Sequence, residues 1–340
     1  MEALTEVHAF ATEVLSRVSA EERRLLELDG TRLVDESAAA VKLNQEICDM
    51  IVMAYTQRES AGGGGGAVSK RNMSKVRSTL RQFVREWSTA GAEEREGAFR
   101  PLIEGLSSYL PKMTAEGRRS RVLSPGSGLG RLVFEVCRAG FSCQGNEFSY
   151  QMLLGANLVL NCGIDAESLP LYPYVLSRAS RKTSQSQFRR VQFPDVAVHE
   201  TQLESGVEMS MTAGEFVEAY RGDRGVWDGL TTCFFIDTAK NVLQYIRLFA
   251  QILRLGGVWA NVGPLLYHFA DQPEDMSLEL SWVEIKPLIA KYFDLKEERE
   301  IQCMYTSSDD FMVNTVYRCI HFVAIRNDVP IDGFSNPVYP

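Results

Sequence analysis

The sequence of 340 residues contains no apolar run long enough to cross a bilayer. Its most apolar stretches, such as 152–160, reach about half of the roughly 20 residues that a membrane-spanning helix needs. The first residues mix Glu2, Glu6, Glu13 and Arg17 with apolar side chains, which is unlike a secretory signal or an Arg-rich transit peptide. We therefore expect no membrane partner and a location in the cytoplasm, with the nucleus as a second compartment.

Cysteine and histidine are too scattered to form a disulfide framework or a metal site. The seven cysteines are odd in number, four of them lie in apolar runs, and no two form a C-x-x-C pair. The four histidines are dispersed and form no H-E-x-x-H arrangement. Reduced thiols in the core are expected instead, and no metal is assigned.

Positive charge is in short supply, with 36 Lys and Arg residues against 44 Asp and Glu and a net charge of −8. Such a chain lacks the broad positive field that non-specific nucleic-acid binding requires, so no nucleic-acid partner is expected. An apolar content of 45% with 24% charged residues is nevertheless enough to form a sizeable core. The sequence therefore predicts a folded protein of one large domain or two small ones. It does not fix the oligomeric state, and a homodimer stays open.

Residues 1–115 have the pattern of a helical region. Apolar residues recur at steps of three and four along 2–57, 76–87 and 99–110, which is the spacing of an amphipathic helix. Five successive glycines at 62–66 interrupt this pattern and predict a flexible loop, because ordering glycine costs the most conformational entropy. We interpret the segment as a helical N-terminal region with one Gly-rich loop.

From residue 116 to residue 340 strands and helices alternate, which is typical of an α/β domain with a parallel sheet and right-handed crossovers. Two closing runs, 295–305 and 313–326, alternate in the manner of an antiparallel pair. A Pro-containing insertion at about 164–205 breaks the rhythm, and we interpret it as a lid or a wall of a substrate site. The predicted strands are 122–123, 141–146, 207–211, 227–236 and 257–262, and the predicted helices are 129–138, 149–161, 214–220, 239–253 and 281–292.

Three glycines, Gly126, Gly128 and Gly130, follow the first predicted strand and precede the first helix of this domain. Glycine is needed at such a turn because the backbone turns tightly and must let a ligand approach without a Cβ atom in the way. Glu147 ends the second strand, 21 residues after Gly126, where a carboxylate can accept hydrogen bonds from both hydroxyls of a ribose. The combination favours a nucleoside-containing cofactor over the alternative, a tight turn without a ligand.

Nicotinamide dehydrogenases and S-adenosylmethionine methyltransferases share the glycine loop and the carboxylate, so further features must distinguish them. Glu215 and Phe216 follow the third strand of the sheet, where a carboxylate can accept from the adenine amine and a ring can stack on the purine. The same pair also fits the start of a helix with a core Phe. An antiparallel final strand is usual in methyltransferases and unusual in dinucleotide folds. Together these features favour a Rossmann-like class I methyltransferase sheet preceded by an α-helical N-terminal region.

Four sequence blocks carry a more specific resemblance. They are 126–132 (GSGLGRL), 143–149 (CQGNEFS), 234–241 (FFIDTAKN) and 256–269 (GGVWANVGPLLYHF). With these blocks the chain resembles the carnosine N-methyltransferases, from about residue 76 to residue 326. The resemblance implies an S-adenosylmethionine-dependent enzyme that methylates the imidazole of carnosine (β-alanyl-histidine) to give anserine.

On the cofactor side, the resemblance implies that Gln82 and Arg85, on the predicted helix at 76–87, reach the cofactor. A guanidinium suits the methionine carboxylate because its planar fork can donate two parallel hydrogen bonds. The family commonly has Asp where Glu215 stands. The remaining cofactor-binding residues implied by the resemblance are Gly126, Gly128, Glu147, Glu215, Phe216 and Cys233.

On the substrate side, the resemblance points to Asp237, His268, Tyr305 and Tyr317, with Asp237, His268 and Tyr317 as the catalytic group. Asp237 follows an apolar strand, so its carboxylate would emerge at the carboxyl end of the sheet, where ligands bind in open α/β folds. We expect it to accept the N–H of the substrate imidazole, which fixes the tautomer and stabilises the imidazolium that forms. Thr315 occupies a position that is usually Tyr in the family, which changes the shape expected for the dipeptide pocket.

Two alternatives stay open from the sequence. The same site could methylate a histidine of a peptide or protein, with basic residues of the insertion as a docking surface. Such a cluster is also common in a solvated loop. A methyltransferase-like scaffold without activity would not bind the cofactor at all. The basic residues concerned are Arg178, Arg181, Lys182, Arg189 and Arg190.

Overall fold

The computed structural model describes residues 9, 12–13, 16–25, 30–56, 70–270, 272, 277–306 and 308–331. The chain forms two compact units, each assembled from three separate segments. The loop predicted at 62–66 lies outside the described residues. Unit 1 consists of Met1–Glu94, Gln151–Thr201 and Tyr305–Thr315, and unit 2 consists of Arg95–Tyr150, Gln202–Met304 and Val316–Pro340.

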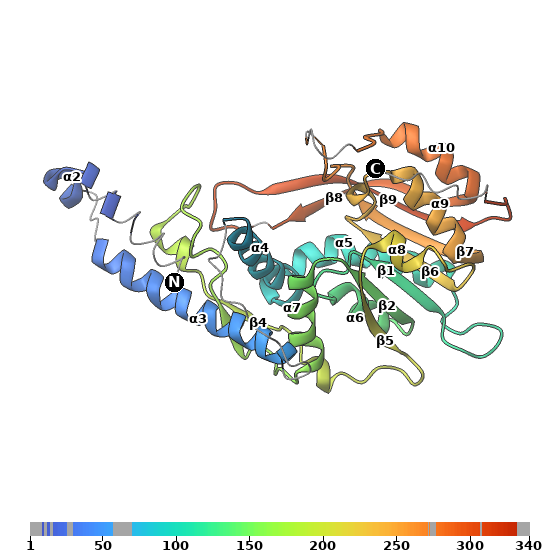
Figure 1. Cartoon of the computed structure of the whole chain (residues 1–340), viewed down its shortest axis with the longest axis horizontal. Helices are drawn as coiled ribbons and strands as arrows, with labels where there is room; N and C mark the ends of the chain where they lie inside the picture. The colour runs from blue at the N-terminus through green and yellow to red at the C-terminus, as the bar shows by residue number, and fades with distance from the viewer. Residues whose placement is uncertain are drawn as a thin grey trace. The chain divides into compact units, whose positions relative to one another are not determined.

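Unit 2 is built on a seven-stranded sheet with the strand order β5-β2-β1-β6-β7-β9-β8 (Figure 1). β1 pairs with β2 and β6, β2 pairs with β5, and β6 pairs with β7, all in parallel, whereas β9 runs antiparallel to β7. This sheet confirms the predicted α/β fold class, including the antiparallel final strand. The strands are β1 (Arg121–Pro125), β2 (Ser142–Glu147), β5 (Met209–Ala213), β6 (Trp227–Cys233), β7 (Leu253–Gly263), β8 (Phe293–Tyr305) and β9 (Thr315–Arg326).

Two hydrophobic clusters lie on the two faces of this sheet. Successive residues of a strand point to opposite faces, and on β7 Trp259 packs in a different cluster from Ala260. The Trp259 ring contacts the rings of Phe249 and Phe322, with centroids 4.9 and 4.7 Å away. Because both faces are covered, the strand is buried without alternation from residue 257 to residue 263. Helices α9 (Val242–Ile252) and α10 (Trp282–Tyr292) supply the Trp259 cluster, together with α8 (Phe216–Tyr220), and helices α5 (Ala92–Tyr109) and α6 (Arg131–Arg138) supply the Ala260 cluster.

The cysteines are reduced, as expected from their scatter in the sequence. All seven are free thiols. Burial raises the pKa of the Cys137 thiol to about 12, which keeps it protonated and unreactive at neutral pH. The buried thiols are Cys137, Cys143, Cys303 and Cys319.

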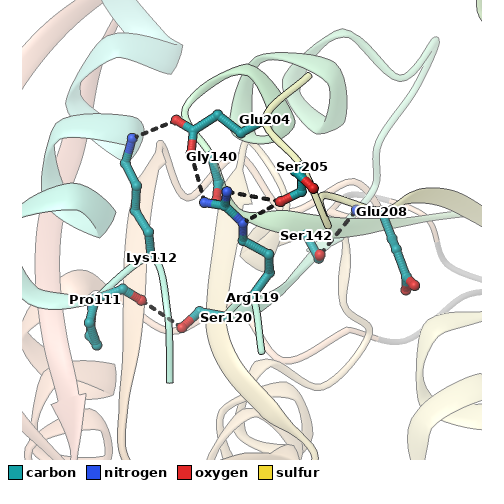
Figure 2. Close-up of polar contacts among 9 residues, drawn as sticks. All are labelled: Pro111, Lys112, Arg119, Ser120, Gly140, Ser142, Glu204, Ser205 and Glu208. Carbon is teal, nitrogen blue, oxygen red and sulfur yellow. Dashed lines mark hydrogen bonds and ion pairs between the residues drawn. The ribbon is translucent and has the colours of Figure 1, made fainter. Parts of the chain in front are cut away.

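Polar contacts tie together the segments that enter β1, β2 and β5 (Figure 2). Arg119, just before β1, donates to Glu204 Oε2 at 2.7 Å and to the backbone oxygens of Gly140 and Ser205. Lys112 Nζ donates to the other Glu204 oxygen at 3.2 Å. These contacts connect the segments at the amino ends of the three strands. Ligands of open α/β sheets bind at the opposite edge, where the carboxyl ends of the strands lie.

Unit 1 is mainly helical and contains most of the predicted insertion. Asn44 exchanges two hydrogen bonds of 2.9 Å with the backbone of Tyr172. The rings of Phe83 and Phe193 lie 4.7 Å apart between centroids. These contacts join the insertion to the helical N-terminal segment within one unit. The elements are α2 (Ala20–Leu25), α3 (Gly30–Thr56), α4 (Lys70–Trp87), η1 (Thr89–Gly91), α7 (Tyr150–Asn161), η2 (Ser184–Phe188), η3 (Val198–Glu200) and the antiparallel pair β3 (Leu169–Leu171) and β4 (Val191–Phe193).

The boundaries of the two units differ from the division at residue 115 that the sequence pattern suggests. Most of α5 belongs to unit 2, while the short segment Tyr305–Thr315 belongs to unit 1. In the part of the chain that the structure describes, no helix combines the length and the apolar character of a membrane span.

Candidate active site

The glycine loop lies between β1, which ends at Pro125, and α6, which begins at Arg131. Gly126, Gly128 and Gly130 have φ angles of 65°, 54° and 83°, in the left-handed region that side chains disfavour. A Cβ atom on Gly126 would lie 2.6 Å from Phe235 Cδ2. The structure therefore requires glycine here, and the predicted turn at the carboxyl end of the first strand is confirmed.

Glu147 is the last residue of β2 and is 8% exposed. Its Oε2 accepts from Gly128 N at 2.8 Å and its Oε1 accepts from Ser149 N at 2.7 Å. These bonds hold the carboxylate against the glycine loop. Each oxygen keeps a second lone pair, so the group can also accept from the two hydroxyls of a ribose. The loop and the carboxylate together fit a nucleoside cofactor.

Glu215 and Phe216 lie where the third strand of the sheet passes into α8. Glu215 is the N-cap of the helix, and its Oε2 accepts from Glu218 N at 2.8 Å. Phe216 is 3% exposed, and its ring centroid lies 5.4 Å from that of Phe235 and 5.3 Å from that of Tyr245. Glu215 thus caps the helix, and Phe216 packs in the core. Contact of either residue with adenine stays a prediction.

Asp237 is a buried carboxylate in the short turn η4 (Ile236–Thr238), and it is 2% exposed. Its Oδ2 accepts from Leu266 N at 2.9 Å. Its Oδ1 is also buried and has no hydrogen-bond partner among the described residues. Burial raises the pKa of this carboxyl above its ordinary value, although the Leu266 N–H and the nearby His268 act in the opposite direction. A buried acceptor without a donor is costly, and an N–H of a ligand would relieve that cost.

His268 contacts Asp237 through the backbone, and Tyr317 contacts Phe234, which lies three residues before Asp237. The backbone N of His268 donates to the backbone oxygen of Asp237 at 3.0 Å, while the His268 side chain is exposed. Tyr317 is half-buried, and its ring centroid lies 5.8 Å from that of Phe234. Cys233, predicted to line the cofactor site, ends β6 directly before Phe234 and is half-buried.

Two strained residues accompany this group. Phe234 and Tyr267 both have φ of 51°, although bulky aromatic residues rarely adopt a left-handed backbone. Phe234 ends the strand earlier than the predicted 227–236, because this conformation cannot continue a strand. Such strain costs on the order of 1–3 kcal/mol per residue and concentrates at functional sites. Nothing in the residue types signals it, so sequence reasoning missed both positions.

Three predicted site residues lie in unit 1. Arg85 is 8% exposed, its Nε lies 3.5 Å from Glu94 Oε2, and its guanidinium lies 4.3 Å from the ring centroid of Tyr305. Gln82 donates through its side-chain amide to Glu86. The structure thus brings together Arg85 and Tyr305, and it shows that Arg85 is a buried charge and not a solvated one.

Several basic residues of the insertion form hydrogen bonds or ion pairs with other residues of unit 1. Arg189 pairs with Asp310 at 2.7 Å, and Arg181 donates to Gln187. Arg178 instead lines a cavity, together with Arg77 and other residues of unit 1. This cavity could not be predicted from the sequence, because its wall comes from three segments that lie far apart along the chain.

A cluster of exposed groups lies elsewhere in unit 1. Among the described residues, one ligand atom each of Asp165, His199 and Glu200 lies within 4.8 Å of the others. All three side chains are exposed, and exposed acidic groups commonly gather in this way without an ion. We assign no metal to them.

Comparison with known proteins gives a consistent set of relatives. The family model of carnosine N-methyltransferase matches residues 65–328. A carnosine N-methyltransferase of Rattus norvegicus is 40% identical over 299 residues, which cover 85% of this chain and 74% of that protein. A carnosine N-methyltransferase of Schizosaccharomyces pombe is 45% identical over 202 residues, covering 59% of this chain and 54% of the relative. One of Dictyostelium discoideum is 38% identical over 259 residues, covering 75% and 55%.

Proposed function

Because the chain belongs to the carnosine N-methyltransferase family, we propose that it methylates an imidazole nitrogen of carnosine to give anserine. The protein is an S-adenosylmethionine-dependent methyltransferase. One observation on this chain supports imidazole as the acceptor more than any other. Asp237 presents a buried carboxylate oxygen that has no donor among the described residues, at the carboxyl edge of the sheet that also carries the glycine loop.

The glycine loop and Glu147 are the residues that would hold the nucleoside part of the cofactor. Gly126 and Gly128 allow close backbone approach, and Glu147 accepts from the ribose hydroxyls with the lone pairs that Gly128 N and Ser149 N leave. When bound, S-adenosylmethionine supplies an electrophilic methyl group on a sulfonium.

Asp237 acts on the methyl acceptor. A free imidazole has a pKa of about 6.5, so most of it is neutral at pH 7 and needs no strong base to become a nucleophile. The Asp237 carboxylate accepts the N–H of one ring nitrogen, which leaves the lone pair on the other nitrogen. It also stabilises the positive charge that the ring acquires on alkylation. This role requires the ionised carboxylate, whose pKa burial raises, and the attack requires the neutral imidazole, so protonation of either group at low pH should lower the activity.

A label-transfer experiment tests the acceptor directly. The purified protein is incubated with methyl-labelled S-adenosylmethionine and either carnosine or a denatured proteome, and the products are separated by chromatography. We expect label in anserine and none in protein. Label that enters only protein would assign the site to a peptide or protein histidine, and absence of cofactor binding by calorimetry would contradict an enzyme of either kind.

A further inference from the structure

The segment that follows β7 holds Asp237 at two points. Leu266 N donates to Asp237 Oδ2 at 2.9 Å, and His268 N donates to the Asp237 backbone oxygen at 3.0 Å. Asp237 Oδ1 is buried and has no hydrogen-bond partner among the described residues. The two carboxylate oxygens therefore differ, because segment 266–268 occupies one of them and the other is left to accept from a ligand. All of these residues belong to unit 2.

Tyr267, which lies between the two donors, has a backbone conformation that permits this arrangement. Its φ of 51° is in the left-handed region. A left-handed residue can direct the N–H groups on either side of it toward one place, as in the backbone nests that bind anions. A bulky aromatic residue adopts this conformation only where its surroundings impose it. The Tyr267 side chain is 7% exposed and belongs to the same hydrophobic cluster as Trp259, so packing around its ring supplies those surroundings.

The Tyr267 hydroxyl anchors segment 266–268 to the start of α10. It donates to the backbone oxygen of Leu280. Burial raises the pKa of Tyr267 to about 12, so the hydroxyl stays protonated and keeps donating at neutral pH. Leu280 directly precedes Ser281, the N-cap of α10, whose backbone N donates to Glu284 Oε2 at 2.8 Å. Because α10 packs in the same hydrophobic cluster as Tyr267, the anchor is attached to a fixed element of unit 2.

Segment 278–280 also contacts the chain that follows Asp237. Leu278 N donates to the backbone oxygen of Lys240 at 2.8 Å, and Leu278 forms a parallel bridge with Asn241. Asn241 is the N-cap of α9, and its Oδ1 accepts from Leu243 N at 3.0 Å. Segment 278–280 thus joins the residues after Asp237 to segment 266–268, so the two parts of the chain that flank the carboxylate are fixed to each other.

We propose that Tyr267 is a positioning residue for Asp237: its anchored hydroxyl and left-handed backbone keep the Leu266 N–H on Oδ2, so that Oδ1 accepts from the ring N–H of the methyl acceptor. The proposal rests on the function proposed above and adds the residue that orients the carboxylate. In this role Tyr267 acts through Asp237 and need not touch the acceptor. Without the anchor, the Leu266 N–H can leave Oδ2 and the carboxylate can rotate, which reduces the fraction of molecules that hold the imidazole in line with the methyl group.

A double-mutant cycle tests whether Tyr267 acts through Asp237. Tyr267→Phe keeps the ring and removes the anchoring hydroxyl. We expect its kcat with carnosine to fall about 3- to 10-fold, because one hydrogen bond that orients the carboxylate is lost, and its cofactor affinity to stay near that of the wild type. In the Asp237→Asn background, which lacks the accepting oxygen, the same substitution should change kcat by less than about twofold.

Amide hydrogen exchange reports on segment 266–268 without any turnover. In the wild type, the hydrogen bonds to Asp237 should protect the N–H groups of Leu266 and His268. In Tyr267→Phe we expect both to exchange about 3- to 10-fold faster, because the segment opens locally more often.

Tyr220→Phe is the matched control. Tyr220 is also buried, and its hydroxyl donates to Gln144 Oε1 at 2.9 Å. The substitution removes a comparable hydrogen bond from unit 2, so it should lower the thermal stability. It should leave kcat and the exchange of the Leu266 amide unchanged.

Three results would overturn the proposal: wild-type kcat in Tyr267→Phe, an equal loss of kcat in the Asp237→Asn background, or unchanged exchange of the Leu266 amide. The equal loss would show that Tyr267 supports the fold without acting through Asp237. If Tyr267→Phe does not fold, the wild type still decides, because a Leu266 amide that exchanges as in an unstructured peptide would exclude the hydrogen bond to Oδ2. Label that enters protein and not carnosine would refute only the proposed acceptor, since the cycle is then measured with that acceptor and the exchange requires none.

Discussion

Replacement of Asp237 by Asn should separate the catalytic role of this carboxylate from its cost to stability. An Asn oxygen can still accept from Leu266 N, as Oδ2 does at 2.9 Å. Its amide NH₂ would replace the unpartnered Oδ1, so it cannot accept an imidazole N–H there and carries no charge. A hydrogen bond to a charged group contributes about 1.5–3 kcal/mol, which corresponds to a fall in kcat of about 10- to 100-fold.

The same substitution should raise the free energy of unfolding at neutral pH. Burial raises the pKa of Asp237 in the folded protein, so the folded state binds this proton more tightly than the unfolded state does. Stability therefore falls as pH rises from the unfolded pKa, near 3.9, through the folded pKa. Asn carries no charge at any pH, and we expect the variant to gain on the order of 1 kcal/mol at pH 7.5 and much less at pH 4.

Asp228 provides a matched control, because its replacement by Asn should change the stability in the opposite direction. It is fully buried, and although burial opposes ionisation, hydrogen bonds from Arg118 and from the Arg121 N–H lower the pKa of its carboxyl overall. Its Oδ1 also lies 2.6 Å from Arg254 Nε. Asp228→Asn should therefore destabilise the protein at pH 7.5, with the loss fading as pH falls toward the range in which the carboxyl is protonated.

Three measurements check this reasoning. Urea unfolding of the cofactor-free protein at both pH values gives the stabilities, steady-state assays with saturating carnosine give kcat, and calorimetry gives cofactor affinity. Cofactor affinity of Asp237→Asn should stay near that of the wild type. Wild-type kcat in this variant would remove Asp237 from the mechanism. A stability change with the same sign in Asp237→Asn and Asp228→Asn at pH 7.5 would refute the electrostatic argument.

Three other substitutions test the neighbouring geometry. Gly126→Ala places a Cβ atom 2.6 Å from Phe235 Cδ2 at a φ of 65°, so urea unfolding should show a loss of about 1–3 kcal/mol, and an unchanged midpoint would contradict this. Glu147→Gln should weaken cofactor binding about tenfold in calorimetry, whereas equal affinity would argue against the ribose contact. Glu94→Gln removes the carboxylate 3.5 Å from buried Arg85 and should cost about 3 kcal/mol in thermal unfolding; a neutral effect would show that the pair contributes nothing.

The parts of the fold that the sequence predicted are those encoded in contiguous residues. Strand β1, the glycine turn and α6 follow one another within 121–138, and each has its own residue pattern. Glu147 was placed correctly at the end of β2 for the same reason. The end of β6 was predicted too late, because 234–236 is as apolar as a strand, and only the left-handed backbone of Phe234 stops it. Asp237 accordingly lies in a 3-10 turn and not at the end of the strand.

Long-range packing could not be predicted in this way. The hydrogen bonds between Asn44 and Tyr172 join positions 128 residues apart, and neither residue type indicates the other. The cavity has the same origin, because Arg81, Arg178 and Thr306 come from separate segments of unit 1. Hydrophobic period shows which face of an element is buried, but it does not identify the segment that covers that face.

The arginines of α4 show why charge has to be interpreted in its surroundings. Arg77, Arg81 and Arg85 repeat every four residues, so the helical period alone does not distinguish them. In the structure, Arg85 is buried beside Glu94, whereas Arg77 and Arg81 are half-buried and line a cavity within unit 1. In unit 2, the buried Asp237 carboxylate has one oxygen, Oδ1, that has no hydrogen-bond partner among the described residues. An imidazole ring that becomes cationic on methylation would complement the charge of Asp237, which an acceptor that stays neutral would not do.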